Sequence, residues 1–358
     1  MVILHIAKIR DNPTNGVCVA VPEHVKAQGK FASVGLMNIR DFKPDGIENC
    51  FVYSEDFTLS SLPKPFDKPD LVVFHEIYIV EYLKISRSLR KQNVPYVIIP
   101  HGSLTKEAQR KKRIKKFVGN FLFKPFIKKA KAIQCLSKKE QENSKFNPSK
   151  FVGPNGCYVP NEKKDSFSQD KINFVYVGRL ESYIKGLDIM LDAFKMVANS
   201  KYNDQCTLSM YGPDYQGRFD YVKQMIEERG IGHFVTINPP VFKQEKEKVL
   251  LGGDVFIQTS RTEGMPMGIL EALSYGLPCL ITEGTTLGNY VKEFDAGWVA
   301  QTNAQSVFEQ IICAIEERKE LENKSNSAIK LIKQNFEWEK VAKDSLNVYS
   351  KFVGVGDK

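Results

Sequence analysis

Residues 260–278, Ser-Arg-Thr-Glu-Gly-Met-Pro-Met-Gly-Ile-Leu-Glu-Ala-Leu-Ser-Tyr-Gly-Leu-Pro, connect the end of one predicted strand to a helix and then to the next strand. The run Asp254–Ser260 is rich in apolar and β-branched residues, which favour strands. Pro266 suits the first position of a helix, because its missing N–H would have no partner there. A helix is predicted over Met267–Gly276 and a strand over Leu277–Thr282, so the segment is a strand–helix–strand unit of a parallel sheet.

The same alternation extends in both directions through the 358 residues. Predicted strands are Val2–Ala7, Leu71–His75, Val94–Pro100, Ala132–Ser137, Ile172–Gly178, Thr207–Gly212, Phe234–Asn238, Asp254–Ser260 and Leu277–Thr282. Predicted helices are Tyr78–Gln92, Lys106–Lys129, Gly186–Ser200, Tyr215–Gly230, Gln244–Gly252, Met267–Gly276, Ser306–Asn335 and Glu337–Phe352. For Ser306–Asn335, one continuous helix and a broken one are both left open. Strands this apolar fit parallel sheets that helices cover on both faces. A polar stretch without periodicity, Asn155–Lys171, is the predicted linker between two doubly wound α/β domains, residues 1–160 and 161–336.

The composition excludes several other classes of protein. With 42% hydrophobic and 26% charged residues, the chain is neither disordered nor fibrous. Its first residues carry no signal-peptide pattern and its apolar runs are too short to span a membrane, so a cytoplasmic protein is expected. The seven cysteines are scattered without a paired or zinc-binding spacing, so they are expected to be reduced core residues.

The positive charge is concentrated in one segment. Between Lys106 and Lys139 there are thirteen Lys and Arg and one acid, so this segment holds an excess of twelve, while the whole chain has a net charge of +9. Within the predicted helix an apolar stripe is formed by Ile114, Phe117, Val118, Phe121 and Leu122, with Lys111, Lys112, Lys115 and Lys116 mostly off it. Such a basic amphipathic helix can lie on an anionic membrane. The alternative is a helix that packs its stripe on the domain and leaves its lysines in solvent.

A phosphate-binding site is predicted at the start of the second domain. The sequence contains no Gly-x-Gly-x-x-Gly, no P-loop and no Asp-x-Asp, so no metal site is predicted and a diphosphate would be held by Lys, Arg and backbone amides. Arg179 and Lys185 lie in a turn between Gly178 and Gly186, whose glycines let the backbone come close to a ligand. An ordinary polar loop with exposed cations is the alternative.

Two glutamates flank the helix start in residues 260–278. Glu263 lies in the loop and Glu271 about one turn inside the helix, where carboxylates can accept hydrogen bonds from sugar and ribose hydroxyls. Backbone amides near Met265 and Met267 form an expected anion site. The alternative is that the helix dipole favours Glu263 and that Glu271 is merely solvated.

Together these motifs carry a resemblance to a known family. The features are Gly178-Arg179-Leu180 with Lys185-Gly186, Glu263-Gly264-Met265-Pro266 with Glu271, Pro154-Asn155-Gly156, Pro100-His101-Gly102, and Phe336-Glu337-Trp338 before a last helix. The chain resembles glycosyltransferase family 4, retaining enzymes of the GT-B fold, over nearly all of its length. The resemblance implies two Rossmann-like domains facing across a cleft, with the last helix, 337–358, crossing back to the first domain.

The resemblance also implies roles for individual residues. Arg179 and Lys185 would bind the donor diphosphate, Glu263 the donor sugar and Glu271 the ribose. His101 would lie near the reacting sugar and the acceptor. The implied donor site comprises Gly16, Arg179, Lys185, Val241, Glu263, Gly264, Met265, Met267 and Glu271. Two positions depart from the family pattern, because Asn15-Gly16 stands where many members have Gly-Gly, and Gly212-Pro213-Asp214 where many have Gly-x-Gly.

These features predict a metal-independent retaining transferase without a cofactor, which uses a UDP-, GDP- or ADP-sugar and a saccharide acceptor linked to polyprenyl diphosphate. No candidate covalent nucleophile is evident, so a front-face reaction is preferred. The expected setting is capsule, O-antigen or exopolysaccharide synthesis at the inner face of the cell membrane. The alternatives are a nucleotide-sugar epimerase, a transferase with a soluble acceptor, and a non-catalytic nucleotide-sugar-binding regulator. Nucleic-acid binding is not expected, because the basic segment lacks a fold signature for base recognition.

Overall fold

The computed structural model describes residues 1–110, 113–144, 146–147, 149–214 and 217–353, without the side chains of residue 107 and residues 113–118. The chain divides into two compact units. Unit 1 comprises Met1–Gly156 and Trp338–Lys358, and unit 2 comprises Cys157–Glu337. The division falls four residues before the domain boundary predicted after residue 160.

Unit 1 is built around a parallel sheet of seven described strands in the order β3-β2-β1-β4-β5-β6-β7. The strands are β1 (Val2–Ala7), β2 (Ser33–Asn38), β3 (Cys50–Val52), β4 (Leu71–His75), β5 (Tyr96–Ile99), β6 (Ala132–Cys135) and β7 (Lys150–Val152). The helices are α1 (Gly16–Gly29), α2 (Glu81–Lys91), α3 (Lys106–Arg110), α4 (Arg113–Lys129), α5 (Lys138–Asn143) and α13 (Trp338–Ser350), with a 3₁₀ turn, η1 (Leu59–Ser61). The order reverses between β1 and β4, so the sheet is doubly wound.

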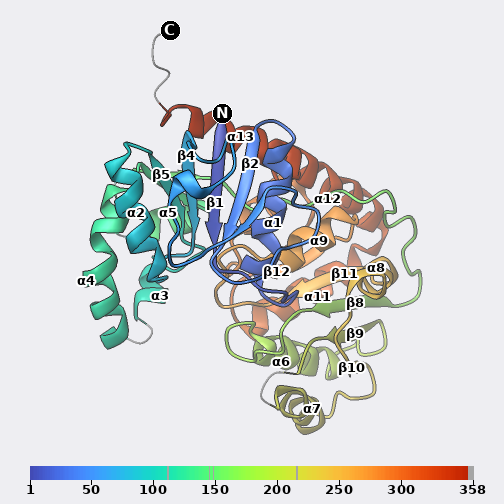
Figure 1. Ribbon diagram of the computed structural model, residues 1–358. Helices are drawn as coiled ribbons and strands as arrows, with labels where there is room; N and C mark the ends of the chain where they lie inside the picture. Colours follow the sequence, from blue (N-terminus) through green and yellow to red (C-terminus); the bar gives the residue numbers. More distant parts are fainter. Residues whose placement is uncertain (111–112, 145, 148, 215–216, 354–358) are drawn as a thin grey trace. The chain divides into compact units, whose positions relative to one another are not determined.

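The C-terminal helix α13 belongs to unit 1, as the sequence predicts, and packs along α1 (Figure 1). Trp338, Val341 and Ala342 form a buried cluster with Ala27 of α1. Gly156 is required at this junction, because a Cβ atom there would lie 2.5 Å from the Trp338 ring. The tryptophan therefore anchors α13 at the end of the first segment of unit 1.

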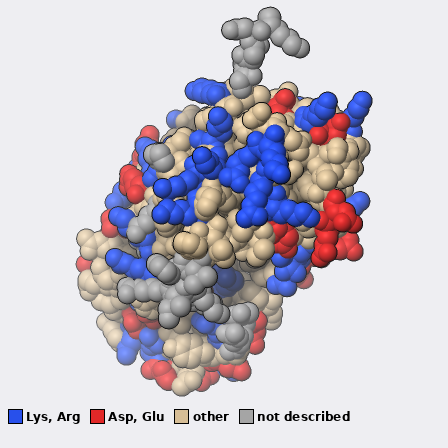
Figure 2. All heavy atoms as spheres, turned by 60° about the vertical axis from the view of Figure 1, so that its left-hand side comes forward, with Lys and Arg blue, Asp and Glu red and all other residues tan. Residues whose placement is uncertain are grey.

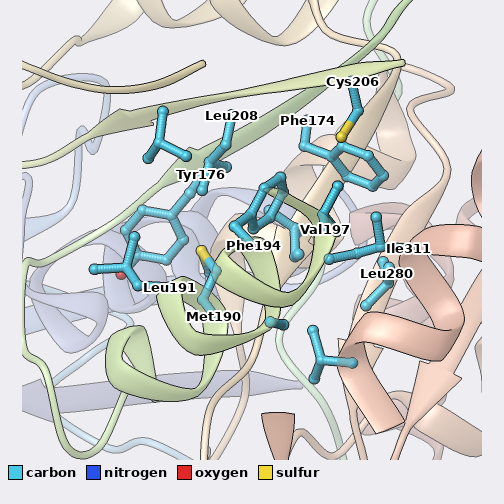
Figure 3. Close-up of a cluster of buried hydrophobic side chains, with 14 of the residues drawn as sticks. Phe174, Tyr176, Met190, Leu191, Phe194, Val197, Cys206, Leu208, Leu280 and Ile311 are labelled. Carbon is cyan, nitrogen blue, oxygen red and sulfur yellow. The ribbon is translucent and has the colours of Figure 1, made fainter. Parts of the chain in front are cut away.

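Unit 2 has a parallel sheet of six described strands in the order β10-β9-β8-β11-β12-β13. The strands are β8 (Ile172–Val177), β9 (Cys206–Tyr211), β10 (Val235–Asn238), β11 (Val255–Gln258), β12 (Cys279–Thr282) and β13 (Gly297–Ala300). The helices are α6 (Leu187–Ala198), α7 (Arg218–Glu228), α8 (Lys243–Gly252), α9 (Met267–Ser274), α10 (Gly288–Phe294), α11 (Ala304–Glu316) and α12 (Leu321–Asn335), with a 3₁₀ turn, η2 (Arg318–Glu320). Figure 3 shows part of its core, where Phe194 of α6 packs edge-on against Phe174 of β8.

Several elements of the structure were not predicted. The strands among them are β2, β3, β7 and β13, and the helices are α1, α5 and α10. Strands β3 and β7 are three residues long, too short to produce a pattern. Helix α1 contains Pro22 and buries seven of its fourteen residues, so no single apolar stripe is visible in its sequence.

Two predicted boundaries also differ from the structure. Pro266 is the N-cap of α9 with ψ 90°, an extended conformation, so Met267 is the first helical residue and the prediction that Pro266 begins the helix was wrong by one position. The single helix predicted over Lys106–Lys129 is described as α3 and α4, on either side of residues 111 and 112.

The side of unit 1 on which α2 and α4 lie carries many Lys and Arg side chains (Figure 2). Lys111 and Lys112 lie outside the described residues, as do the side chains of Ile114, Lys115, Lys116, Phe117 and Val118. Phe121 and Leu122, the described members of the predicted apolar stripe, are 79% and 54% exposed. Helix α4 instead packs on the core through its buried residues Phe123, Phe126 and Ile127. The stripe alternative, in which these residues pack on the domain, therefore fails for Phe121 and Leu122.

Among the described residues, no helix is both long enough and apolar enough to cross a membrane.

Candidate active site

The strand order of unit 2 places the predicted site residues in neighbouring loops. Strand β8 pairs with β9 on one side and with β11 on the other, so the winding of the sheet reverses between β8 and β11. Ligands of open α/β sheets bind beyond the carboxyl ends of the strands at this point. Arg179 and Lys185 lie in the loop after β8, and Glu263 lies in the loop after β11. The fold thus brings together residues that are 78 positions apart in sequence.

Lys185 and Glu263 form an ion pair at this edge of the sheet. The Nζ atom of Lys185 lies 2.5 Å from Oε1 of Glu263, and the two side chains are 13% and 14% exposed. Oε1 also accepts hydrogen bonds from Nε2 of Gln258 at 3.0 Å and from Oγ of Ser260 at 2.9 Å. No described residue donates to Oε2. One carboxylate oxygen is therefore held by three donors, and the other remains free to accept a hydrogen bond from a ligand.

The glycines beside these residues allow close contact within the protein. Gly186 has φ +64°, and a Cβ atom there would lie 2.0 Å from the carbonyl oxygen of Thr259. At Gly212 a Cβ atom would lie 2.2 Å from the carbonyl oxygen of Gly178. Gly186 is therefore needed for a contact within the protein, with the residue that follows β11, and its approach to a ligand stays a prediction. This contact sets the position of the preceding residue, Lys185.

Arg261 connects the same two loops and was not predicted. Its guanidinium donates to both carboxylate oxygens of Asp188, at 2.7 and 2.6 Å, and lies 4.5 Å from the centre of the Tyr183 ring. The ion pair lowers the pKa of Asp188 against the opposing effect of burial. Such bidentate pairs are geometrically specific. Together with Gly186, Arg261 fixes the loop that carries Lys185.

Arg179 and Glu271 have different surroundings from Lys185 and Glu263. The side chain of Arg179 is exposed and has no ion-pair partner among the described residues. Glu271 lies on α9, and its Oε2 pairs with Nζ of Lys246 on α8. Lys246 was missed, because α8 carries three lysines and nothing in its sequence separates one from the others.

The other predicted donor residues of unit 2 lie around the start of α9 or apart from it. Gly264 is exposed, while Met265 and Met267 pack partly against the core. The backbone N–H groups of Gly264 and Met265 have no hydrogen-bond partner among the described residues, which leaves them available to an anion. Val241 lies in the loop between β10 and α8, without a described contact to the Lys185–Glu263 pair.

Gly16 and His101 belong to unit 1. Gly16 is the first residue of α1, and the side chain of Asn15 caps this helix by accepting from the N–H groups of Val17 and Cys18. His101 follows β5 in the left-handed conformation, with φ +48°. The next residue, Gly102, donates its N–H to the buried carboxylate of Glu140 at 2.6 Å, and burial raises the pKa of Glu140. Glu140 therefore holds the turn that carries His101.

His101 is the outermost member of a row of histidines that was not predicted. His101, His75 of β4 and His5 of β1 are joined ring to ring by hydrogen bonds of 3.1 and 2.9 Å. His24 of α1 lies nearby and bonds Asn155 at 3.1 Å. Desolvation lowers the pKa of His5 to about 3 and of His24 to about 4, and also lowers that of His75. The signal for this row in the sequence is a histidine inside each of two apolar strands, His5 in β1 and His75 in β4.

Comparison with known proteins completes the description of unit 2. Residues 160–331, nearly all of this unit, match one family model. That model describes the glycosyl transferases of group 1. An uncharacterised glycosyltransferase of Methanocaldococcus jannaschii is 25% identical over 181 residues, which are 50% of this chain and 45% of that protein. The lipopolysaccharide 1,6-galactosyltransferase of Salmonella typhimurium is 32% identical over 111 residues, 31% of this chain and 30% of that protein.

The match is to the class of enzyme that the sequence predicts, and it covers nearly all of unit 2. The alignments span less than half the length of these two curated relatives. The solved structure of HepE from Anabaena in complex with UDP and glucose has a TM-score of 0.74 and 16% identity, with 98% of this chain and 100% of that chain covered. Because this likeness extends over the whole chain, it confirms the predicted GT-B fold of two Rossmann-like units.

Proposed function

We propose that the protein is a retaining, metal-independent glycosyltransferase that moves a sugar from a nucleotide diphosphate to a hydroxyl of a saccharide acceptor. The Lys185–Glu263 pair at the point where the winding of the unit 2 sheet reverses is the observation that carries this proposal. A cation and a carboxylate fixed side by side suit a ligand in which an anionic diphosphate adjoins a hydroxyl-bearing sugar. The complex of HepE with UDP and glucose supports a donor of this class.

The chemical step follows from these charges. As the bond between the anomeric carbon and the diphosphate breaks, negative charge grows on the leaving oxygen and positive charge grows on the sugar. Lys185, Arg179 and the N–H groups before α9 would stabilise the negative charge, and one such preorganised group contributes about 10²- to 10³-fold in rate. The acceptor hydroxyl would enter on the face that the diphosphate leaves, with its proton passing to the departing phosphate, so the anomeric configuration would be kept.

Metal independence is part of the proposal. The sequence has no Asp-x-Asp, and among the described residues no group of three or more His, Cys, Asp or Glu side chains could hold a metal ion. The cations of the site would replace a divalent ion at the diphosphate.

The donor is to be identified by thermal shift with UDP-, GDP- and ADP-sugars. A ligand that binds only the folded state stabilises it by about 2.7 kcal/mol at a concentration of 100 Kd, so the correct donor raises the Tm most. The selected donor is then incubated with and without saccharide acceptors. A glycosylated product supports the transferase, an epimerised donor without acceptor identifies an epimerase, and binding without turnover identifies a regulator.

Replacing Glu263 and replacing Glu271 are expected to have different effects on the affinity for the nucleoside diphosphate. Glu271→Ala should weaken binding of the nucleoside diphosphate about tenfold or more, because a charged hydrogen bond to ribose contributes about 1.5 to 3 kcal/mol. Glu263→Ala should leave that affinity within about threefold and lower transfer, because its free oxygen is proposed to meet the sugar. Calorimetric titration with the diphosphate alone separates the two roles. Equal losses of affinity in both variants would exclude separate roles for Glu271 at the ribose and Glu263 at the sugar. Glu283→Ala in unit 2, which removes an exposed carboxylate, is the control.

The acceptor is proposed to be linked to polyprenyl diphosphate, in capsule, O-antigen or exopolysaccharide synthesis, with the protein peripheral at the inner face of the cell membrane. The twelve-charge excess between Lys106 and Lys139 and the exposed side chains of Phe121 and Leu122 on α4 support this setting. The relative from Salmonella typhimurium is a lipopolysaccharide galactosyltransferase, which supports an acceptor of this kind.

Binding to lipid vesicles tests the membrane surface. Replacing Lys111, Lys112, Lys115 and Lys116 by Gln should greatly reduce sedimentation with anionic vesicles, since each Lys near such a surface contributes about 1 kcal/mol. Phe121→Ser with Leu122→Ser should also weaken it. Wild-type binding should fall as salt rises, because the Debye length shortens from about 10 Å at 0.1 M to about 3 Å at 1 M.

Tyr221→Ser is the matched control, because Tyr221 is 51% exposed on α7 of unit 2. Both test variants should bind the donor like wild type. If the quadruple Lys variant still sediments with anionic vesicles like the wild type, α4 is a solvated face and the lipid-linked acceptor loses its main support.

A further inference from the structure

The row of buried histidines in unit 1 continues beyond His5 to the C-terminal helix. Nε2 of His5 bonds Oε1 of Gln28 at 2.9 Å, and Nε2 of Gln28 bonds Oγ of Ser345 at 2.9 Å. Ser345 lies on α13, and its Oγ bonds the carbonyl oxygen of Ala342 at 2.9 Å. His5, Gln28 and Ser345 are all buried. One continuous chain of hydrogen bonds thus runs from Ala342 to His101 through the interior of unit 1.

The donor in each bond can be assigned from the Ala342 end. A carbonyl oxygen only accepts, so the hydroxyl of Ser345 donates to Ala342 and accepts from the amide nitrogen of Gln28. The amide oxygen of Gln28 then faces His5, whose Nε2 must carry a hydrogen. Because desolvation lowers the pKa of His5 to about 3, this ring is neutral at pH 7 and its Nδ1 is an acceptor.

The donor and acceptor nitrogens of the next two rings, His75 and His101, can be assigned in the same way. Nδ1 of His5 accepts from Nε2 of His75, and Nδ1 of His75 accepts from Nε2 of His101. Both rings are neutral at pH 7, since burial lowers the pKa of each. The hydrogen of His101 is therefore on Nε2, and its Nδ1 carries a lone pair. Nδ1 has no partner among the described residues and is not one of the described side-chain atoms buried without one.

We propose that Gln28 and Ser345 act through His5 and His75 to hold His101 as the Nε2–H tautomer, so that its Nδ1 accepts a hydrogen bond from a hydroxyl of the saccharide substrates. His101 then contacts the substrate, and the other four are positioning residues. A neutral acceptor suits a hydroxyl and cannot donate to the leaving phosphate. The substrate half of this proposal rests on the proposed function, whereas the tautomer half does not.

If donor and acceptor were exchanged in every hydrogen bond of this row, bonds at its Ala342 end would be lost. For His101 to carry its hydrogen on Nδ1, Gln28 would have to donate to His5, and its oxygen would then face Ser345. The serine hydroxyl would have to turn from Ala342 to meet it. Leaving a buried polar group without a partner costs about 1 to 3 kcal/mol, which corresponds to about 5- to 150-fold between the two tautomers.

Nitrogen NMR of the full chain labelled with ¹⁵N-histidine tests the tautomer without any substrate. The chain has five histidines, so each ring can be followed, and the protonated and bare nitrogens of a neutral ring are distinct in such spectra. At pH 7 we expect His101, His75 and His5 all as Nε2–H. Gln28→Met removes the acceptor for His5 and should make the Nδ1–H form of His101 detectable. Gln28→Glu keeps an acceptor there and should retain the Nε2–H form.

His24→Gln is the matched control, because His24 is an equally buried histidine of unit 1 that lies outside the chain. It should leave the tautomer of His101 unchanged even if it lowers the Tm. Ser345→Ala provides a second test at the far end and should also admit the Nδ1–H form. A wild-type His101 with its hydrogen on Nδ1, or a Gln28→Met protein that keeps only the Nε2–H form, would overturn the proposal.

The substrate contact is tested with the donor that the thermal-shift screen selects. His101→Asn keeps an acceptor near the position of Nδ1 and suits the left-handed backbone, whereas His101→Phe keeps a ring without nitrogen. Transfer should fall about 10²-fold in the Phe variant and much less in the Asn variant. Parallel loss of donor hydrolysis without acceptor would place the hydroxyl on the donor sugar, and loss of transfer alone would place it on the acceptor. Equal activities of the Asn and Phe variants would exclude the contact.

Failure of this proposal can be told from failure of the proposed function. If no nucleotide sugar is turned over, the transferase is wrong, while the NMR result for His101 still stands or falls by itself.

Discussion

Lys185→Ala should lower the kcat of sugar transfer by at least about 10²-fold, because it removes a cation placed to meet the leaving diphosphate. The fold should survive. Glu263 keeps hydrogen bonds from Gln258 and Ser260, and the loop keeps its contacts through Gly186 and Arg261. Steady-state kinetics with the selected donor, together with the Tm of each protein, provides the measurement. Addition of EDTA to the wild type should leave kcat nearly unchanged.

Lys292→Ala is the matched control for this variant. Lys292 is a lysine of unit 2 whose side chain is 58% exposed and 3.9 Å from Glu283. Its loss should change kcat by less than about twofold, because exposed ion pairs contribute little. Strict dependence of the wild type on a divalent cation, or a Lys185→Ala variant with full activity, would refute the proposed diphosphate clamp.

The free energy of unfolding should fall steeply between pH 7 and pH 5. Burial lowers the pKa of His5 and of His101 to about 3, that of His24 to about 4, and that of His75 in the same direction. In the unfolded chain these rings bind protons below about pH 6.5, whereas in the folded unit they stay neutral, so protons favour unfolding. Four such rings over about 1.5 pH units amount to roughly 6 to 8 kcal/mol.

Two buried acids act in the opposite direction. Burial raises the pKa of Glu76 and of Glu140, so the folded unit takes up their protons at higher pH than the unfolded chain, and they gain stability as the pH falls. The four histidines outnumber these two acids. Because a domain is typically stable by about 5 to 15 kcal/mol, the expected loss is a large share of the total.

The two tryptophans report on the units separately, since Trp298 lies in unit 2 and Trp338 in unit 1. His24 lies edge-on to Trp338, with 4.8 Å between ring centres. Urea unfolding at pH 7, 6 and 5, followed by fluorescence in Trp298→Phe and Trp338→Phe proteins, should show the acid effect first at Trp338. His24→Gln should make the pH dependence shallower. Stability that is flat across this range, or a response that begins at Trp298, would contradict the prediction.

Much of the candidate site could be predicted because its signals are local. The turn from Gly178 to Gly186 and the stretch from Glu263 to Glu271 each follow an apolar strand, and strand ends are where parallel sheets bind ligands. The GT-B fold and the likeness of unit 2 to glycosyl transferases of group 1 were expected from the motifs together. Metal independence, the acceptor and the individual residue roles remain predictions.

What the sequence by itself determined was the alternation of strands and helices, the two-domain division and the loops that carry Arg179, Lys185 and Glu263. Only the tertiary structure decided which of these residues meet. Strand order places β8 beside β11, and no sequence pattern states that order, so the pairing of Arg261 with Asp188 was missed. The row from Ser345 to His101 could not be seen in the sequence either, because it joins α13 and α1 to two strands and to the turn after a third. Hydrogen bonds between residues up to 317 positions apart depend on non-local packing, whereas periodicity and turn chemistry depend only on neighbours in the chain.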